Sequence, residues 1–270
     1  MEWWQAIILG LVQGLTEFLP VSSSGHLMIG RALLGAEAAD DLVFEVLVHA
    51  ATVLATIVVF RKQILKLLQG FFRFKYNDET DYILKICVSM VPVFFVGVFL
   101  KDSVEALFNS LAVVGAALQL TAMLLILSDR VDASGRTRAE HRNGISYLQA
   151  FIVGVGQAFA VIPGLSRSGT TISTGLIAGV KRDRIAQFSF LMVIVPILGE
   201  AFLDIVGGDF TSSSTGVPAL ALGFATAFLS GLFACKLMIG LVRKAKMKWF
   251  ALYCLIVGLG ATILNIWLQR

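Results

Sequence analysis

The sequence predicts an all-α integral membrane protein, in which six transmembrane helices and two re-entrant helical hairpins form an inverted repeat. Three observations predict this fold: an apolar composition, polar interruptions in two apolar segments, and basic residues confined to alternate loops. Hydrophobic residues make up 57% of the 270 residues and charged residues only 15%, which is far from the balance of a water-soluble domain. We therefore expect a single membrane domain over residues 1–270.

The first apolar segment, residues 3–34, is interrupted by the polar stretch EFLPVSSSGH, Glu17–His26. Non-helical backbone is tolerated at membrane depth only where protein buries it or where it lines a wet cavity. Pro20 divides the segment into two arms, so we expect a re-entrant hairpin with the polar residues at its tip. The preceding residues, MEWWQAIILG, carry an acid and two tryptophans instead of the basic start of a signal peptide, and the tryptophans suit an interfacial anchor.

Apolar runs long enough to cross a bilayer, which takes about 20 residues, follow the first hairpin. They lie at residues 42–60, 83–100, 111–128, 185–206, 218–242 and 249–268. We expect residues 129–145 to form a cytoplasmic linker. Between this linker and the fourth run, residues 146–180 break at PGLSRSG, Pro163–Gly169, in the way that the first segment does. This pattern predicts a second re-entrant hairpin.

Basic residues distinguish the two sides of the membrane. If each hairpin enters and leaves on one side, alternate loops receive 16 lysines and arginines, and the others keep only Lys101 and the terminal Arg270, beside the acidic stretch AEAADD at 36–41. Positive charge marks the cytoplasmic side of membrane proteins. We therefore expect the first hairpin to enter from outside, the second from the cytoplasm, and both chain ends to lie outside. The modest excess charge orients the protein and does not predict nucleic-acid binding.

The two hairpins are also related in sequence. A shift of 144 residues aligns Gly10 with Gly154, Gln13 with Gln157, Ser22 with Ser166, Ser24 with Ser168 and Gly25 with Gly169. The halves, residues 1–128 and 146–270, each hold a hairpin and three spans, and because three is odd the second half must be inverted. Inverted repeats with broken helices bring their polar tips together near the membrane midplane.

The second tip has the residues of a phosphate cradle. Arg167 is the only basic residue in that hairpin, and its planar guanidinium suits carboxylate or phosphate. A helix is expected to begin at this point, where free backbone N–H groups also favour an anion. The remaining members of the expected cradle are small or hydroxylated: Ser166, Ser168, Gly169 and Thr171.

The first tip adds groups that could act on a phosphate. Gln13 and Glu17 are four residues apart and so share a helix face, from which the carboxylate could hold a divalent cation that bridges phosphate oxygens. Ser23 lies close to His26, as a nucleophile lies close to its acid or base partner. The surrounding residues, Ser22, Ser24 and Gly25, are further candidates for phosphate binding. Together the tips indicate phosphoryl chemistry on a substrate from the membrane.

The same residues also allow simpler interpretations. Glu17 and Arg167 could form a structural ion pair, and the serines could serve as helix caps. Glu45 and His49 share one face of the next span, where structural roles are favoured over a substrate entrance. Paired hairpins in an inverted repeat are also a transporter architecture, so a transporter or flippase of a polyprenyl phosphate lipid is the alternative function. The hydroxyls beside His26 and Arg167 favour an enzyme, because transport needs no nucleophile.

The stretches QGLTEFLPVSSSGH, Gln13–His26, and PGLSRSGTT, Pro163–Thr171, resemble the two signature motifs of the undecaprenyl-diphosphatase family, the bacitracin-resistance lipid phosphatases. The resemblance implies a multi-pass enzyme of the bacterial cytoplasmic (inner) membrane that hydrolyses undecaprenyl diphosphate to undecaprenyl phosphate and inorganic phosphate. This reaction recycles the lipid carrier for peptidoglycan synthesis and confers bacitracin resistance. The resemblance also implies dependence on a divalent cation, Mg²⁺ or Ca²⁺, and a homodimer.

Individual roles follow from the same resemblance. Glu17 matches the second acid of the first motif, Ser23 and His26 match its candidate catalytic groups, and Arg167 matches the phosphate-binding arginine. Gln13 stands where a first glutamate is common, and since an amide adds no charge, the number of metal ligands stays open. Either Ser23 attacks the terminal phosphorus with His26 as acid or base, or His26 is itself the nucleophile. The active site is expected to face the periplasmic, external side.

Overall fold

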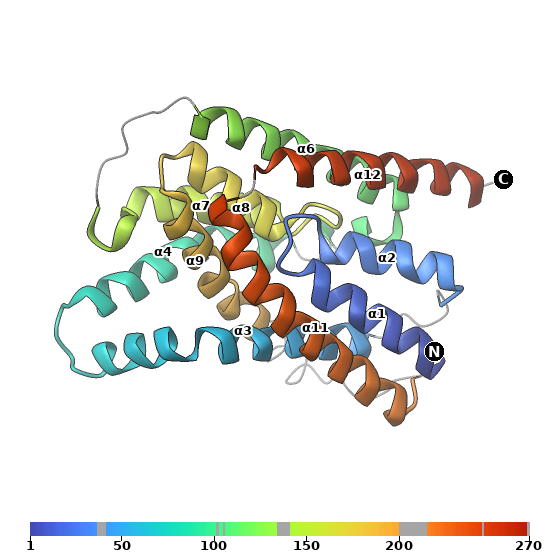
Figure 1. The fold of residues 1–270 in the computed structure, drawn as a ribbon, viewed down its shortest axis with the longest axis horizontal. Helices are drawn as coiled ribbons and strands as arrows, with labels where there is room; N and C mark the ends of the chain where they lie inside the picture. The colour runs from blue at the N-terminus through green and yellow to red at the C-terminus, as the bar shows by residue number, and fades with distance from the viewer. Residues whose placement is uncertain are drawn as a thin grey trace.

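The computed structural model describes residues 1–36, 42–100, 103–104, 106–133, 141–199, 215–244 and 246–268. These residues form helices and connecting turns without a strand among them, which confirms the all-α prediction (Figure 1). The α-helices are α1 (Trp3–Thr16), α2 (Ser23–Leu34), α3 (Leu42–Phe71), α4 (Asp78–Phe99), α6 (Leu111–Ala133), α7 (Tyr147–Phe159), α8 (Arg167–Ile177), α9 (Arg182–Met192), α11 (Val217–Lys244) and α12 (Lys248–Leu268). Short 3₁₀ turns lie at η1 (Ala106–Asn109) and η2 (Arg142–Gly144).

Within the described residues, five helices are long and apolar enough to cross a membrane: Val43–Phe71, Asp78–Phe99, Leu111–Asp132, Val217–Val242 and Lys248–Leu268. Several of them expose large apolar side chains, such as Phe94 on α4 and Ile263 on α12. Exposed apolar surface of this extent suits contact with lipid. The chain is therefore a multi-pass membrane protein.

The remaining predicted span, residues 185–206, is not one long helix where the structure describes it. Helix α9 ends at Met192, Val193 forms a turn, and residues 194–199 are helical again. Pro196 lies just after this turn; it has no N–H to donate to the carbonyl of Met192, so the regular hydrogen bonding of the helix is interrupted. Residues 200–206, the end of the predicted span, lie outside the described residues.

Both predicted hairpins are helix–turn–helix units. Helices α1 and α2 contact each other, as do α7 and α8. Ser22 adopts a left-handed φ of 71° and caps α2, its Oγ accepting from the Gly25 N–H at 3.3 Å. Ser166 caps α8 in the same way, its Oγ accepting from Gly169 N–H at 3.1 Å. The predicted breaks and the serine caps are confirmed, and the re-entrant path through a bilayer stays a prediction.

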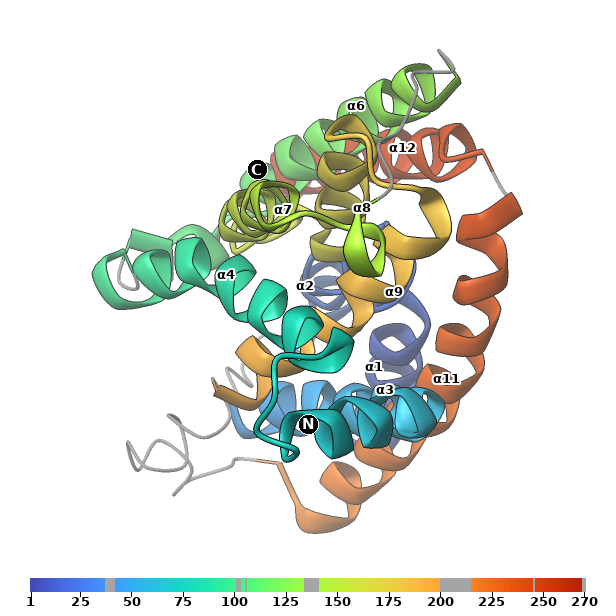
Figure 2. The same ribbon diagram turned by 90° about the vertical axis from the view of Figure 1, so that its left-hand side faces the viewer.

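Helix packing relates the two halves. Helix α1 packs on α11 and α7 packs on α4, while α6 and α12 lie side by side (Figures 1 and 2). A Cβ on Gly10 would lie 2.3 Å from Thr226 Oγ1 of α11, and one on its repeat mate Gly154 would lie 2.2 Å from the Ser89 carbonyl oxygen of α4. Matched glycines thus sit at matched helix crossings. This reciprocal packing favours the predicted repeat, whose inversion across the membrane stays a prediction.

Candidate active site

The two hairpin tips touch each other. Ser168 Oγ donates to the Leu19 carbonyl oxygen at 3.0 Å, and the Gly164 N–H donates to Ser24 Oγ at 3.5 Å. A Cβ on Gly25 would lie 3.2 Å from the Gly164 Cα, so this glycine permits the close approach of the tips. The structure therefore brings the two polar motifs to one place, as the sequence predicted.

Glu17 is the centre of the first tip. Its Oε2 accepts hydrogen bonds from Ser23 Oγ at 2.6 Å and from Gln13 Nε2 at 2.9 Å. His49 Nε2 of α3 lies 4.0 Å from the same oxygen, and the Glu17 side chain is only 8% exposed. Gln13 and Glu17 thus share a helix face as their spacing predicted, whereas Ser23, which was paired with His26 in the sequence, is hydrogen-bonded to Glu17. The imidazole near this cluster is that of His49, which was not a predicted site residue.

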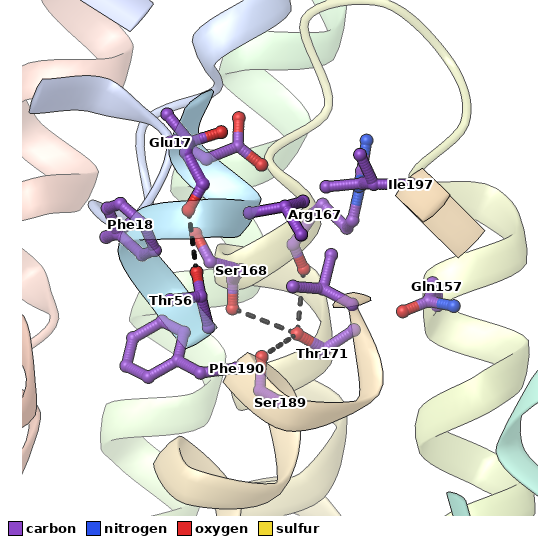
Figure 3. Close-up of a pocket in the computed structure, with 13 residues that line it drawn as sticks. Glu17, Phe18, Thr56, Gln157, Arg167, Ser168, Thr171, Ser189, Phe190 and Ile197 are labelled. Atoms are coloured by element: carbon purple, nitrogen blue, oxygen red, sulfur yellow. Dashed lines mark hydrogen bonds between the residues drawn. The ribbon is translucent and has the colours of Figure 1, made fainter. Parts of the chain in front are cut away.

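Arg167 reaches the same site from the second tip. It is the first residue of α8 and lines a pocket with Glu17, Thr56, Gln157 and Ser168 (Figure 3). Within the described part of the chain, the Arg167 guanidinium has no hydrogen bond and no ion pair within 4.0 Å. The structural ion pair with Glu17 is therefore not formed here. A half-buried guanidinium without a hydrogen bond suits an anion such as phosphate. The carboxylate on the other side of the pocket suits a metal cation bound to that anion.

The hydroxyls of the second tip divide into two groups. Ser168 and Thr171 line the pocket, and Thr171 Oγ1 lies 2.6 Å from Ser189 Oγ of α9. Ser166 instead caps α8, and its backbone N–H donates to Thr121 Oγ1 at 3.1 Å. Ser22, Ser24, Gly25 and Gly169 likewise shape and join the tips without lining the pocket.

His26 does not line this pocket. Its Nδ1 lies 2.7 Å from the Ser22 carbonyl oxygen, and its Nε2 lies 2.8 Å from the Tyr253 hydroxyl of α12. The two rings are stacked, with centroids 5.6 Å apart and 5° between their planes. Both ring nitrogens therefore have partners away from Glu17, and the catalytic role of His26 stays a prediction.

Comparison with known proteins covers almost the whole chain. Residues 6–260 match the family described as bacitracin resistance protein BacA. The chain belongs to this family. A protein named undecaprenyl-diphosphatase from Parabacteroides distasonis is 52% identical over 263 residues, which is 96% of this chain and 97% of the relative. Proteins of the same name from Bacteroides fragilis and Christiangramia forsetii are 50% identical over 269 residues and 48% identical over 266 residues. These alignments cover 98% and 97% of this chain, and 99% and 98% of the relatives.

In this BacA-family site the oxygen ligands for a metal are few. The described residues contain no group of three or more His, Cys, Asp or Glu that could hold a metal ion. Glu17 offers a carboxylate, and the buried Gln13 Oε1 has no hydrogen-bond partner among the residues that the structure describes. Carboxylate and amide oxygens suit Mg²⁺ and Ca²⁺, which can take further oxygens from water or a phosphate. The set fits such a cation provided that the substrate supplies some of the ligands.

The sequence analysis missed several residues of the pocket: Thr52, Thr56, Gln157 and Ser189. Thr52 and Thr56 follow His49 by three and seven residues, a helical spacing that places them on one face of α3. Gln157 is the repeat mate of Gln13, which was itself a candidate. Glu45, for which a structural role was favoured, pairs with Arg31 of α2 at 2.7 Å.

Proposed function

We propose that this chain hydrolyses undecaprenyl diphosphate to undecaprenyl phosphate and inorganic phosphate. The product is the lipid carrier of peptidoglycan precursors, so the activity recycles that carrier and confers resistance to bacitracin. The name shared by relatives about 50% identical to the chain supports the substrate. The observation that carries the proposal is the Ser23 hydroxyl, which donates at 2.6 Å to Glu17, a residue that lines one pocket together with Arg167.

The proposed chemistry uses both tips. Arg167 binds the terminal phosphoryl group through charge-assisted hydrogen bonds and stabilises the charge that develops on it. Ser23 Oγ attacks the terminal phosphorus. Its proton moves to the Glu17 carboxylate, to which the hydroxyl is already hydrogen-bonded. The bond from that phosphorus to the bridging oxygen breaks, and undecaprenyl phosphate leaves. Water then hydrolyses the phosphoserine to release inorganic phosphate. His26 as the nucleophile is the competing route.

A divalent cation, Mg²⁺ or Ca²⁺, is part of the proposal. Glu17 would hold it, with the amide oxygen of Gln13 as a second ligand. When bound, such an ion neutralises charge on the phosphate oxygens. Removal of divalent cations with a chelator is therefore expected to abolish phosphate release, and addition of Mg²⁺ or Ca²⁺ to restore it.

The proposal extends to orientation and assembly. The site is proposed to open to the periplasmic side, because the first hairpin is expected to enter from outside. A homodimer in the cytoplasmic membrane is proposed from the family resemblance. The mass of the detergent-solubilised protein, measured by light scattering, tests the dimer.

The function is tested with purified protein in detergent and undecaprenyl diphosphate. We expect release of inorganic phosphate that depends on a divalent cation, with undecaprenyl phosphate as the lipid product. A folded protein that releases no phosphate in the presence of Mg²⁺ or Ca²⁺ contradicts the proposal. If the same protein in vesicles moves polyprenyl phosphate between leaflets, the transporter alternative replaces it.

A further inference from the structure

We infer that Gln157 is a further substrate-binding residue, whose side-chain amide donates a hydrogen bond to the phosphoryl group held by Arg167. The inference rests on the proposed function, because it concerns the same pocket. Gln157 lies near the end of α7, two residues before the helix ends at Phe159. It lines the pocket together with Arg167 and Thr171, and in Figure 3 its amide oxygen points toward the side on which Thr171 lies.

The Gln157 amide is buried without adequate partners. The residue is 2% exposed, and its Oε1 has no hydrogen-bond partner in the part of the chain that the structure describes. Among the described residues its Nε2 has only the Met90 sulfur as a partner, at 3.9 Å, and a thioether is a weak acceptor. Buried amides in native proteins nearly always have partners, because an unmatched one lowers stability. A donor in the pocket would satisfy Oε1 as the amide stands, and an acceptor would be met by Nε2 once the amide turns over.

The neighbours of Gln157 favour an anion as that ligand. Among the described residues the Arg167 guanidinium has no hydrogen bond and no ion pair within 4.0 Å, and the hydroxyls of Ser168, Thr171 and Ser189 line the same pocket. A phosphoryl group on Arg167 has acceptor oxygens only, so it would be met by the N–H₂ end of the amide. The terminal torsion of glutamine is broad and roughly two-fold, so a half-turn presents either end to the pocket.

The internal repeat explains why the Gln157 amide is available to bind a ligand. Its mate Gln13 donates from Nε2 to Glu17, four residues later. A shift of 144 residues places Val161 where Glu17 stands in the first half, so Gln157 has no carboxylate to orient. The two glutamines therefore have different roles: Gln13 holds the carboxylate, and Gln157 binds the phosphoryl group.

Replacement of Gln157 by methionine separates binding from folding. Methionine keeps the length and volume of the side chain and suits the contact with Met90, but it removes both polar ends. We expect the KM for undecaprenyl diphosphate to rise about 10-fold or more, the loss of one hydrogen bond to a charged group. The melting temperature in detergent should stay the same or rise, because an unmatched buried amide is lost. The matched variant Gln187→Met, in a separate polar cleft, should keep KM within about 2-fold.

Two results of this experiment overturn the inference. An unchanged KM in Gln157→Met means that the amide does not touch the substrate. A raised KM with a melting temperature several degrees lower means that the amide is structural. If the wild-type protein itself releases no phosphate, both the proposed function and this inference are wrong. If the wild type is active and only the expected change in KM is missing, the inference is wrong and the proposed function stands.

The variant Gln157→Glu distinguishes an anion from a cation as the partner of residue 157. A carboxylate repels a phosphoryl group, so we expect less activity than in Gln157→Met at every Mg²⁺ concentration. A cation ligand at this position would give the opposite result. Activity that is retained, or reached at a lower Mg²⁺ concentration than in the wild type, overturns the assignment to phosphate.

Discussion

Arg167 is a half-buried cation that forms no ion pair within 4.0 Å with a carboxylate of the described residues, although its charge acts on Glu17 across the shared pocket. Its position as the first residue of α8 places it beside the free N–H groups at the start of that helix. The helix N-terminus and the guanidinium favour the same kind of ligand, an anion. This convergence at one residue is the physical reason for assigning phosphate binding to the second tip.

Substitution of Arg167 should therefore reduce catalysis sharply. We expect kcat/KM for undecaprenyl diphosphate to fall about 100-fold or more in Arg167→Gln, because a charge-assisted bidentate contact is lost. Arg167→Lys should keep part of the activity, since charge remains without the planar fork. Steady-state phosphate release measures both. Lys75→Gln, on an exposed loop, is the control, and equal losses in Arg167→Gln and this control would refute the role of Arg167.

Ser23 and His26 give a second prediction about single residues. Ser23 Oγ is hydrogen-bonded to Glu17, whereas the His26 nitrogens face Ser22 and Tyr253. We expect Ser23→Ala to release phosphate at about 1% of the wild-type rate or less, the scale of loss typical of a removed nucleophile. Enzyme quenched during turnover should carry acid-stable phosphoserine. Near-normal turnover in Ser23→Ala would rule out Ser23 as the nucleophile. Acid-labile phosphohistidine in the quenched enzyme would favour His26 in its place.

At the residue scale, spacing along the chain predicted part of the site. Gln13, Glu17 and Ser23 lie within a single hairpin, so a helical repeat and a turn suffice to bring them together. The contact between His26 and Tyr253 joins residues 227 positions apart, and His49 approaches Glu17 from a different helix. Contacts of this kind depend on how helices pack, which spacing does not contain. The repeat was a long-range signal: it aligned Gln157 with Gln13, although Gln157 was not among the predicted site residues.

At the scale of elements, glycines determine how closely helices cross. A Cβ on Gly154 would lie 2.2 Å from a backbone oxygen of α4, which cannot move aside as a flexible side chain can. The same addition at Gly240 of α11 meets nothing within 4 Å among the described residues. The two positions therefore differ in packing and not in local helix chemistry.

Alanine at these two glycines should have opposite effects on stability. Gly154→Ala is expected to destabilise the protein by about 1–3 kcal/mol, because α7 and α4 must separate to admit the methyl group. Gly240→Ala should be neutral or slightly stabilising, since alanine is the better helix former. Thermal unfolding in detergent measures both. Equal melting temperatures for the two variants would show that the crossing of α7 and α4 is not close-packed.

Apolar run length predicted most of the long helices but not the break after α9. Hydropathy treats Pro196 as one more tolerated residue within an apolar run, whereas the helix responds to its missing N–H. The hairpin breaks were predictable because polar residues, proline and glycine coincide there, and the caps at Ser22 and Ser166 follow from the same motifs. Composition thus predicts where helices can lie, and the hydrogen-bonding capacity of individual residues determines where they end.

At the scale of the whole molecule, each hairpin is held by helices from both halves of the chain. Helix α1 packs on α11, and α8 packs on α6. The tips are joined directly by the hydrogen bond from Ser168 to the Leu19 carbonyl oxygen. Neither half can form the pocket alone, because Glu17 comes from one half and Arg167 from the other.

The orientation of the molecule gives a prediction at this scale. In a background without the native cysteines, Lys75→Cys should react with a membrane-impermeant thiol reagent only from the cytoplasmic side, because that loop carries the positive charge. Glu2→Cys should react in intact cells. The reverse pattern would invert the proposed topology and move the site to the cytoplasmic side.

The central claim is that the two hairpin tips form one diphosphate site, and a double-mutant cycle between them tests it most directly. The measurement is kcat/KM for phosphate release from undecaprenyl diphosphate in the wild type, Ser23→Ala, Arg167→Lys and the double variant. Residues that act together are strongly non-additive, so the double variant should be little worse than Ser23→Ala alone. Losses that multiply as independent effects would contradict a single shared site.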